Sequence, residues 1–312
     1  MCANMLAALK SVPKPKRRFP ELSYANDSHP SAARAFIRLV ETLAGRDRFA
    51  DLYDQWRREV VPTGDRVFGR MLDLIDLKVC RTGITLEPAS DEPLVIVANH
   101  PFGIGDGIAI LSLAESLGRP FEVMIHSDLL RVSEMTGYAL PVDFSETREA
   151  LKRNMAVRRE ALRLLREGVT IVVFPAGGVA TASRGFGQAE DLPWKLFPAR
   201  LIQEGRASVL PVHFAGENGA LLHLASRLSP TMRTSLLIHE FAKLSGKTID
   251  MHIGRIMGPD ELAAFRDRNE LIGHLRKAVF ALDTGERLTA PRRWLPPRWP
   301  LPERHSRNQT RA

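Results

Sequence analysis

Cysteine is nearly absent from this sequence of 312 residues, and the two that occur, Cys2 and Cys80, lie far apart. Two cysteines build neither a disulfide framework nor a cysteine-rich zinc cluster, and such sparse use is typical of a reducing compartment. The histidines show no HExxH spacing, so we expect no metal site. A GxSxG turn is also missing, which excludes the nucleophile elbow of serine hydrolases.

Long hydrophobic runs are missing as well. No apolar stretch reaches the roughly 18 residues needed to cross a bilayer. The segment MCANMLAALKSVPKPKRRFPELS at 1–23 places its charges after a short apolar part, which is the wrong order for a secretory signal. We therefore expect the protein in the cytoplasm, or attached peripherally to the cytoplasmic face of the inner membrane.

Positive charge is in excess, with a formal net charge of +8 and a pI of about 9.9. Much of it lies in KPKRR at 14–18 and in the tail APRRWLPPRWPLPERHSR, where arginine is mixed with tryptophan. Basic side chains attract anionic lipid by about 1 kcal/mol each, and tryptophan favours the membrane interface. We expect a membrane surface as a partner, with solvated tails as the alternative. No nucleic-acid-binding motif accompanies the charge, so we expect no nucleic acid.

The composition changes along the chain and predicts four parts. Residues 1–30 form a flexible basic arm, and 31–80 form a helical segment that breaks near Gly45. The main α/β domain follows at 81–285. A basic tail rich in proline, arginine and tryptophan ends the chain at 286–312, where the prolines forbid a regular helix.

Short apolar runs rich in β-branched residues predict strands at 94–99, 121–126, 169–175, 207–216 and 248–254. Helical patterns occur at 65–77, 108–118, 148–168, 191–205 and 259–283. Strands that alternate with helices predict an α/β fold, with a central mostly parallel sheet flanked by helices and an N-terminal helical prefix. Strands of such sheets are covered on both faces, which explains their continuous apolar character.

The stretch VIVANHPFGIGDG at 95–107 places His100 where the first apolar run ends, and Asp106 follows a glycine-containing turn. Reactive groups gather at the carboxyl ends of strands in α/β sheets. The turn can return the carboxylate to the imidazole from a helix that begins near Gly107. A carboxylate bonded to one ring nitrogen fixes the tautomer and makes the other nitrogen a better general base. The alternative is structural: Asp106 caps a helix, and His100 is a polar residue at a strand end.

Two further turns follow apolar strands. FPAGGVAT at 174–181 contains Pro175 and the Gly177-Gly178 pair, whose backbone N–H groups can form an anion-binding concavity. LPVHFAGENG at 210–219 ends another strand in a glycine turn. Taken alone, each is equally well explained as an ordinary connection from a strand to a loop.

Three segments together carry a resemblance. NHPFGIGD, FPAGGVAT followed by DLPWKLFPARLI, and VLPVHFAGENG resemble the blocks of the glycerophosphate and lysophospholipid acyltransferase family in order and spacing. More narrowly, the chain looks like the hemolysin-like acyltransferase branch, some members of which make bacterial ornithine lipids. The similarity covers roughly residues 65–260. It implies that the α/β domain is an acyltransferase of phospholipid or ornithine-lipid synthesis.

The resemblance implies a role for each block. His100 is the general base that deprotonates the acceptor, and Asp106 orients it. A lysolipid hydroxyl then attacks an acyl thioester of acyl-CoA or acyl carrier protein, with no acyl-enzyme and no bound cofactor. The FPAGG turn holds the polar head of the acceptor, and VLPVHFAG lies near the acyl site. The expected substrate-binding residues are Asn99, Gly103, Arg131, Arg148, Phe174, Pro175, Ala176, Gly177, Gly178 and Lys195.

The sequence departs from the commonest family pattern at two places. Five residues separate His100 from Asp106 instead of four, although the narrower branch shares this HxxxxxD spacing. Ala176 stands where the family usually has a glutamate after Phe-Pro. The missing carboxylate argues against a standard glycerol-phosphate acceptor and favours another head group, such as that of a lyso-ornithine lipid.

The arginine block of the family is ambiguous here. Either Arg131 or Arg148 can meet a phosphate or carboxylate, although most arginines are simply exposed. Lys195, beside Trp194, is interpreted as part of the substrate rim, with a snorkelling lysine as the alternative. The histidines of other apolar runs are expected in the core or at strand ends: His126, His213 and His252.

A function of another class is compatible with the same sequence. Ala176 and the HxxxxxD spacing are also consistent with a non-catalytic lipid- or acyl-chain-binding protein on the same fold. Turnover of acyl-CoA or acyl carrier protein distinguishes the enzyme from the binding protein.

Overall fold

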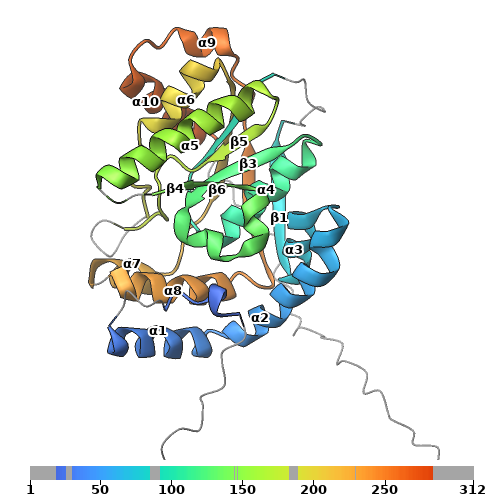
Figure 1. Ribbon diagram of the computed structural model, residues 1–312, viewed down its shortest axis with the longest axis vertical. Coiled ribbons are helices and arrows are strands. Elements are labelled where there is room, and N and C mark those ends of the chain that lie inside the picture. The colour runs from blue at the N-terminus through green and yellow to red at the C-terminus, as the bar shows by residue number, and fades with distance from the viewer. Residues whose placement is uncertain are drawn as a thin grey trace, which may run out of the picture.

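The computed structural model (Figure 1) describes residues 19–25, 30–84, 92–143, 145, 147–182, 189–228 and 230–283. One seven-stranded sheet forms the centre, in the order β1-β7-β6-β2-β5-β3-β4. The strands are β1 (Leu77–Gly83), β2 (Leu94–Ala98), β3 (Phe121–His126), β4 (Ala139–Val142), β5 (Thr170–Val173), β6 (Ser208–Ala215) and β7 (Lys247–Ile253). The predicted tail and most of the predicted arm lie outside the described residues.

Helices surround the sheet: α1 (Ser31–Leu43), α2 (Arg46–Gln55), α3 (Val67–Leu74), α4 (Ile104–Ser116), α5 (Arg148–Arg166), α6 (Phe197–Gly205), α7 (Ala220–Leu228), α8 (Pro230–Ala242), α9 (Pro259–Ala263) and α10 (Arg268–Phe280). A π-helical turn at Trp56–Val60 extends α2, and short 3-10 turns occur at Pro20–Leu22, Val61–Thr63, Ser127–Arg131 and Ser133–Gly137.

The direction of the strands decides where chemistry can gather. Neighbouring strands run parallel throughout the described sheet except for the pair β6–β7, which is antiparallel. Five strands, β2 to β6, therefore end at the same edge, and β1 and β7 end at the opposite one. The predicted fold class is confirmed: the chain is α/β, with a mostly parallel central sheet flanked by helices.

Strand β2 shows why its residues read as one apolar run. Leu94, Ile96 and Ala98 face a core shared with α3 and α4, whereas Val95 and Val97 face a second core shared with α5, α6 and α10. Successive side chains of a strand point to opposite faces, so both faces of β2 are buried. Figure 1 shows α5, α6, α9 and α10 gathered at one end of the view, and α1, α2, α7 and α8 at the other.

The N-terminal helices pack into the same body as the sheet. Gly45, with a φ of 79°, separates α1 from α2 at the predicted break. The Tyr53 hydroxyl of α2 donates a hydrogen bond of 2.6 Å to the Glu134 carboxylate, far along the chain. The predicted boundary between residues 80 and 81 falls inside β1. The sheet therefore begins at Leu77, a few residues before the end of the predicted helical segment.

The sequence patterns predict neither β1 nor β4, which form the two edges of the sheet. Along β1 exposed and half-buried positions interrupt the apolar ones, and it carries Lys78 and Arg81. Strand β4 has four residues, one of which is Pro141. Edge strands have one unpaired side, where charge and proline are tolerated, so they lack the apolar signature of the central strands.

Two predicted helices are shorter than expected. The pattern at 191–205 forms a helix only from Phe197, because Pro193 interrupts the preceding residues and Pro198 suits a first turn. The pattern at 259–283 divides into α9 and α10, since the Asp267 carboxylate accepts two backbone N–H groups and caps α10 anew. Neither α7 nor α8 is predicted by the sequence patterns that identify the other helices.

Candidate active site

His100 and Asp106 meet at the edge where five strands end. His100 follows β2, and Asp106 lies in the first turn of α4. The imidazole Nδ1 is 2.9 Å from Asp106 Oδ1, although this oxygen lies away from the ideal direction of a ring N–H. The Asp106 side chain is fully buried, whereas 16% of the His100 side chain is exposed. The contact therefore holds the ring from its buried side.

The turn between the two residues begins α4 earlier than predicted. Gly103 has a φ of 76°, so the helix starts at Ile104 and not near Gly107. The Phe102 N–H donates a 2.8 Å hydrogen bond to Asp106 Oδ2. One carboxylate oxygen thus holds the backbone of the turn and the other faces the imidazole. Asp106 is not the N-cap of α4, because Gly103 occupies that position and no side chain caps the helix there.

Two contacts from the FPAGG loop restrain His100. The Phe174 ring stacks on the imidazole, with centroids 4.0 Å apart and planes at 25°. The Ala180 N–H donates a 2.8 Å hydrogen bond to the His100 carbonyl oxygen. Phe174 and Asp106 limit rotation of the ring, and the Ala180 N–H holds the backbone that carries it. Such restraint suits a side chain that approaches a proton donor in one defined direction.

Asp191 is a further residue of this site that the sequence analysis did not single out. Its Oδ1 accepts the His100 backbone N–H at 3.1 Å, and its Oδ2 accepts the Trp194 indole N–H at 2.9 Å. Burial raises the pKa of the Asp191 carboxyl above its ordinary value, against the lowering effect of these donors and of His100. An aspartate three residues before a buried tryptophan is the available sequence signal, in DLPW.

We expect Asp191→Asn to destabilise the fold by about 1–3 kcal/mol, because both partners are donors and an amide offers only one acceptor. The raised pKa means that ionising Asp191 costs stability in the folded state. The stability advantage of the wild type over the variant should therefore shrink as pH rises from the ordinary aspartate range through the raised pKa. Denaturant unfolding of both proteins at pH 4 and pH 7 measures this difference, and an increase with pH contradicts the assignment.

The FPAGG turn is tight, and its Pro175 and Ala176 are buried whereas Gly177 and Gly178 are half-buried. Gly177 has a φ of 69°, and its N–H donates to the Phe174 carbonyl at 3.0 Å. Pro175 is buried, and the Ala176 methyl packs in the core shared with α5 and α6. Position 176 therefore presents no polar group. Lys195 lies beside this turn through its backbone N–H, bonded to the Pro175 carbonyl at 2.9 Å, and its side chain is exposed.

Asn99 is engaged within the protein. Its Nδ2 donates to the Phe214 carbonyl at 2.9 Å, and its Oδ1 accepts the Phe214 N–H at 2.7 Å. The side chain continues the pairing of β2 with β6 beyond the end of β2. Of the residues predicted to bind substrate, Asn99 and Gly103 thus shape the turn around His100, and Phe174 to Gly178 line its other side.

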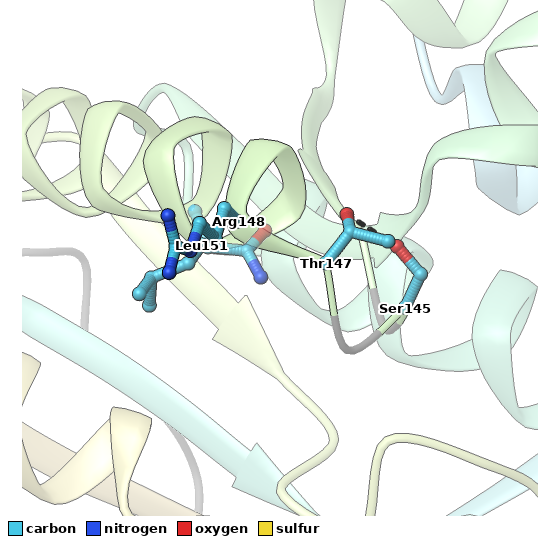
Figure 2. Close-up of a pocket in the computed structure, with 5 residues that line it drawn as sticks. Ser145, Thr147, Arg148 and Leu151 are labelled. Carbon is cyan, nitrogen blue, oxygen red and sulfur yellow. Dashed lines mark hydrogen bonds between the residues drawn. The ribbon is translucent and has the colours of Figure 1, made fainter.

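Arg131 and Arg148 are not brought to His100. They follow β3 and β4, which lie two and three strands from β2, at a lateral distance of roughly 10 and 14 Å. Both side chains are exposed. Figure 2 shows Arg148 beside Leu151 in a separate surface pocket at the start of α5, opposite Ser145 and Thr147.

The other histidines stand apart from the pair. His213 and His252 face each other across β6 and β7 with ring centroids 6.0 Å apart, and burial lowers the pKa of His213 to about 4. His126 is exposed at the end of β3. Within the described ranges, no group of three histidine, cysteine, aspartate or glutamate side chains is placed to hold a metal ion.

Comparison with known proteins shows what this chain is similar to. Residues 79–215 match the family model described as Acyltransferase. The lyso-glycine lipid O-acyltransferase of Phocaeicola vulgatus is 23% identical over 196 residues, which is 59% of this chain and just under two thirds, 66%, of that protein. The crystal structure of the 1-acyl-sn-glycerophosphate acyltransferase PlsC from Thermotoga maritima aligns with a TM-score of 0.46 and 17% identity, over 80% of this chain and 92% of that one. The matched region contains His100, Asp106 and the FPAGG turn, so the part of the chain that carries the candidate site is similar to acyltransferases.

Proposed function

We propose that this protein transfers a fatty acyl chain from acyl-CoA or acyl carrier protein to the hydroxyl of a lysolipid. One observation carries the proposal: a buried carboxylate, Asp106, lies 2.9 Å from Nδ1 of a partly exposed histidine at the sheet edge where five strands end. In the proposed reaction His100 is the general base, and Asp106 orients it.

The proposed reaction needs only the second ring nitrogen. Because Nδ1 faces Asp106, Nε2 accepts the proton of the acceptor hydroxyl. The hydroxyl oxygen forms a bond to the thioester carbonyl carbon, and the carbon–sulfur bond of the tetrahedral intermediate then breaks. The proton on Nε2 passes to the leaving thiolate, which restores the neutral imidazole. The balance closes without a bound cofactor, and the acyl thioester is a co-substrate.

The acceptor we propose carries an amino-acid head group, as in a lyso-ornithine or lyso-glycine lipid. Ala176 supplies no carboxylate to the turn assigned to the head group, and its methyl is buried in the core. The similar Phocaeicola vulgatus protein is named as an acyltransferase of lyso-glycine lipid, which supports the same class of acceptor.

Purified protein with palmitoyl-CoA or palmitoyl-acyl carrier protein tests this function. Thiol release and the acylated product are measured with lyso-ornithine lipid, lyso-glycine lipid and lysophosphatidic acid as acceptors. Acceptor-dependent release with any of them supports an O-acyltransferase, and the ratio among them identifies the head group. Binding of these lipids without turnover of either thioester overturns the proposal in favour of a lipid-binding protein.

We further propose that the protein binds the membrane surface peripherally through α1 and α7. None of the helices in the described part of the chain has the length and apolar character to cross a bilayer. Both α1 and α7 pack on α8, and their outer faces carry large exposed side chains. These are Phe36 (43% exposed), Leu39 (57%), Leu43 (79%), Leu221 (52%) and Leu224 (39%). Phe36, Leu39 and Leu43 recur at helical spacing and share one face of α1, as Leu221 and Leu224 do on α7. Apolar side chains that share an exposed face are typical of an interaction surface, and an amphiphilic acceptor resides in lipid.

The double substitution Leu39→Glu and Leu43→Glu should weaken binding to vesicles of phosphatidylglycerol and phosphatidylethanolamine by at least about tenfold, because both leucines lose apolar burial in lipid. Co-sedimentation with vesicles measures the affinity. Leu151→Glu with Met155→Glu, on the exposed face of α5, is the matched control and should bind as the wild type does. Equal weakening by both pairs contradicts a specific role for α1.

A further inference from the structure

An arginine of α8 lies beside the candidate site. Arg233 Nη2 donates a 2.9 Å hydrogen bond to the Val179 carbonyl. The N–H of the next residue, Ala180, belongs to the same peptide unit and donates to the His100 carbonyl at 2.8 Å. Because one peptide unit connects the two hydrogen bonds, the guanidinium lies within about 8 Å of the His100 carbonyl oxygen.

The charge of this arginine is not neutralised by the part of the chain that the structure describes. Arg233 is half-buried and pairs with no carboxylate there; its one hydrogen bond is to a neutral carbonyl. Burial alone lowers the pKa of the guanidinium, with no effect from a neighbouring acid. A guanidinium has five N–H donors and favours planar anions such as carboxylate or phosphate. Partly buried charges are normally paired, so an anionic ligand would complete this one.

The surroundings of Arg233 suit the head of an amphiphile. A Cβ atom at Gly178 would lie 3.6 Å from Arg233 Nη2 and 3.3 Å from Leu192 Cδ1, so bare backbone borders both the guanidinium and an apolar side chain. Leu192 is 38% exposed. One turn along α8, Leu237 lies near Gly103, in the turn that follows His100. Helix α8 therefore extends along the site, with its cation at the FPAGG end.

We propose that Arg233 binds the anionic group, carboxylate or phosphate, of the acceptor lysolipid and so selects acceptors by that charge. The inference rests on the proposed function, because it assigns the head-group end of the same site. With its hydroxyl at His100 and its anion at Arg233, one acceptor would extend along the short path between these two residues. The neutral Ala176 leaves the guanidinium free of an internal competitor in this turn.

The test compares a carboxylate acceptor with its neutral amide, which differ in charge, and with an acceptor that carries a phosphate instead. Acyl transfer is measured to N-(3-hydroxydecanoyl)glycine, to its neutral primary amide and to 1-decanoylglycerol 3-phosphate, for the wild type, Arg233→Gln and Arg233→Lys. Arg159→Gln, on the exposed face of α5, is the control for loss of one positive charge. Arg233→Gln should raise KM for the preferred anionic acceptor about 10- to 100-fold, with kcat changed less than threefold. KM for the amide should not change, and Arg233→Lys should fall between.

The outcomes separate this inference from the proposed function. An equal rise in KM for the acid and the amide, or no rise for either, overturns the role of Arg233 while transfer itself stands. If Arg233→Gln shows no unfolding transition and is therefore not folded, the same comparison of KM for the acid and the amide is made with Arg233→Lys. Calorimetric binding of N-decanoylglycine against N-decanoylglycinamide needs no turnover. A preference for the acid that Arg233→Gln abolishes, in a protein that acylates none of the acceptors, supports the anion site and overturns the transferase. The ratio of the acid to the phosphate acceptor distinguishes carboxylate from phosphate.

Discussion

Replacing His100 by alanine should reduce acyl transfer by about 10²- to 10⁴-fold, the usual contribution of a positioned general base. The hydroxyl proton then has no acceptor, while the thioester and the acceptor still bind. Thiol release from the acyl donor in the presence of acceptor measures the effect. The loss should appear in kcat, because the ring of His100 contacts Phe174 and Asp106 within the protein.

Two further variants keep this result interpretable. His100→Ala leaves the buried Asp106 carboxylate without its neighbour, so stability should fall by about 1–3 kcal/mol. His100→Gln keeps a donor toward Asp106 but offers no base, and it should be equally inactive with a smaller loss of stability. His126→Ala, at an exposed position, is the control and should keep full activity. Full activity of a folded His100→Gln enzyme would contradict the assignment of His100 as the general base.

Asp106→Asn should have the second largest effect, a loss of kcat of about 10²-fold or more with KM little changed. Asparagine keeps the size of the side chain and an oxygen for the Phe102 N–H. Its NH₂ group then faces His100 Nδ1, which must accept instead of donate. The ring proton moves to Nε2, and this nitrogen no longer accepts the proton of the acceptor.

Nitrogen NMR of the imidazole checks the cause directly. The wild type should carry its ring proton on Nδ1, and Asp106→Asn should carry it on Nε2. Asp260→Asn, which removes one carboxylate from an exposed position of α9, should change neither the tautomer nor the rate. A variant that loses activity with an unchanged tautomer shows that Asp106 acts only by holding the turn at Phe102.

The central strands and the His100–Asp106 pair are accessible to sequence reasoning for a common reason. Strand β2 is buried on both faces, so its residues form a continuous apolar run whose end marks the position of His100. Gly103 follows closely, and its positive φ requires a residue without a side chain. Both constraints are local, so each is recognisable in a few consecutive residues of the sequence.

The edge strands, and the residues that surround His100 and Asp106, have no such local pattern in the sequence. Strands β1 and β4 need to satisfy only one neighbour, and α7 and α8 form a helix pair whose pattern does not stand out. Arg131 and Arg148 have the right chemistry for an anion, but they follow the wrong strands to reach His100. Asp191 bonds His100 from 91 positions along the chain, and Arg233 bonds Val179 from 54 positions away. Both are recognised only by these hydrogen bonds.

Residues that are neighbours along the chain are enough to predict the layered α/β class, the strand that ends at His100 and the short turn before Asp106. The charged side chains around that pair come from distant segments, and the folded chain alone shows which of them lie there. The strand order places β3 and β4 two and three strands from β2, which keeps Arg131 and Arg148 away from His100, and the contact of α8 with the FPAGG loop brings Arg233 to the site. Contacts between distant segments depend on how the layers pack, which no local pattern encodes.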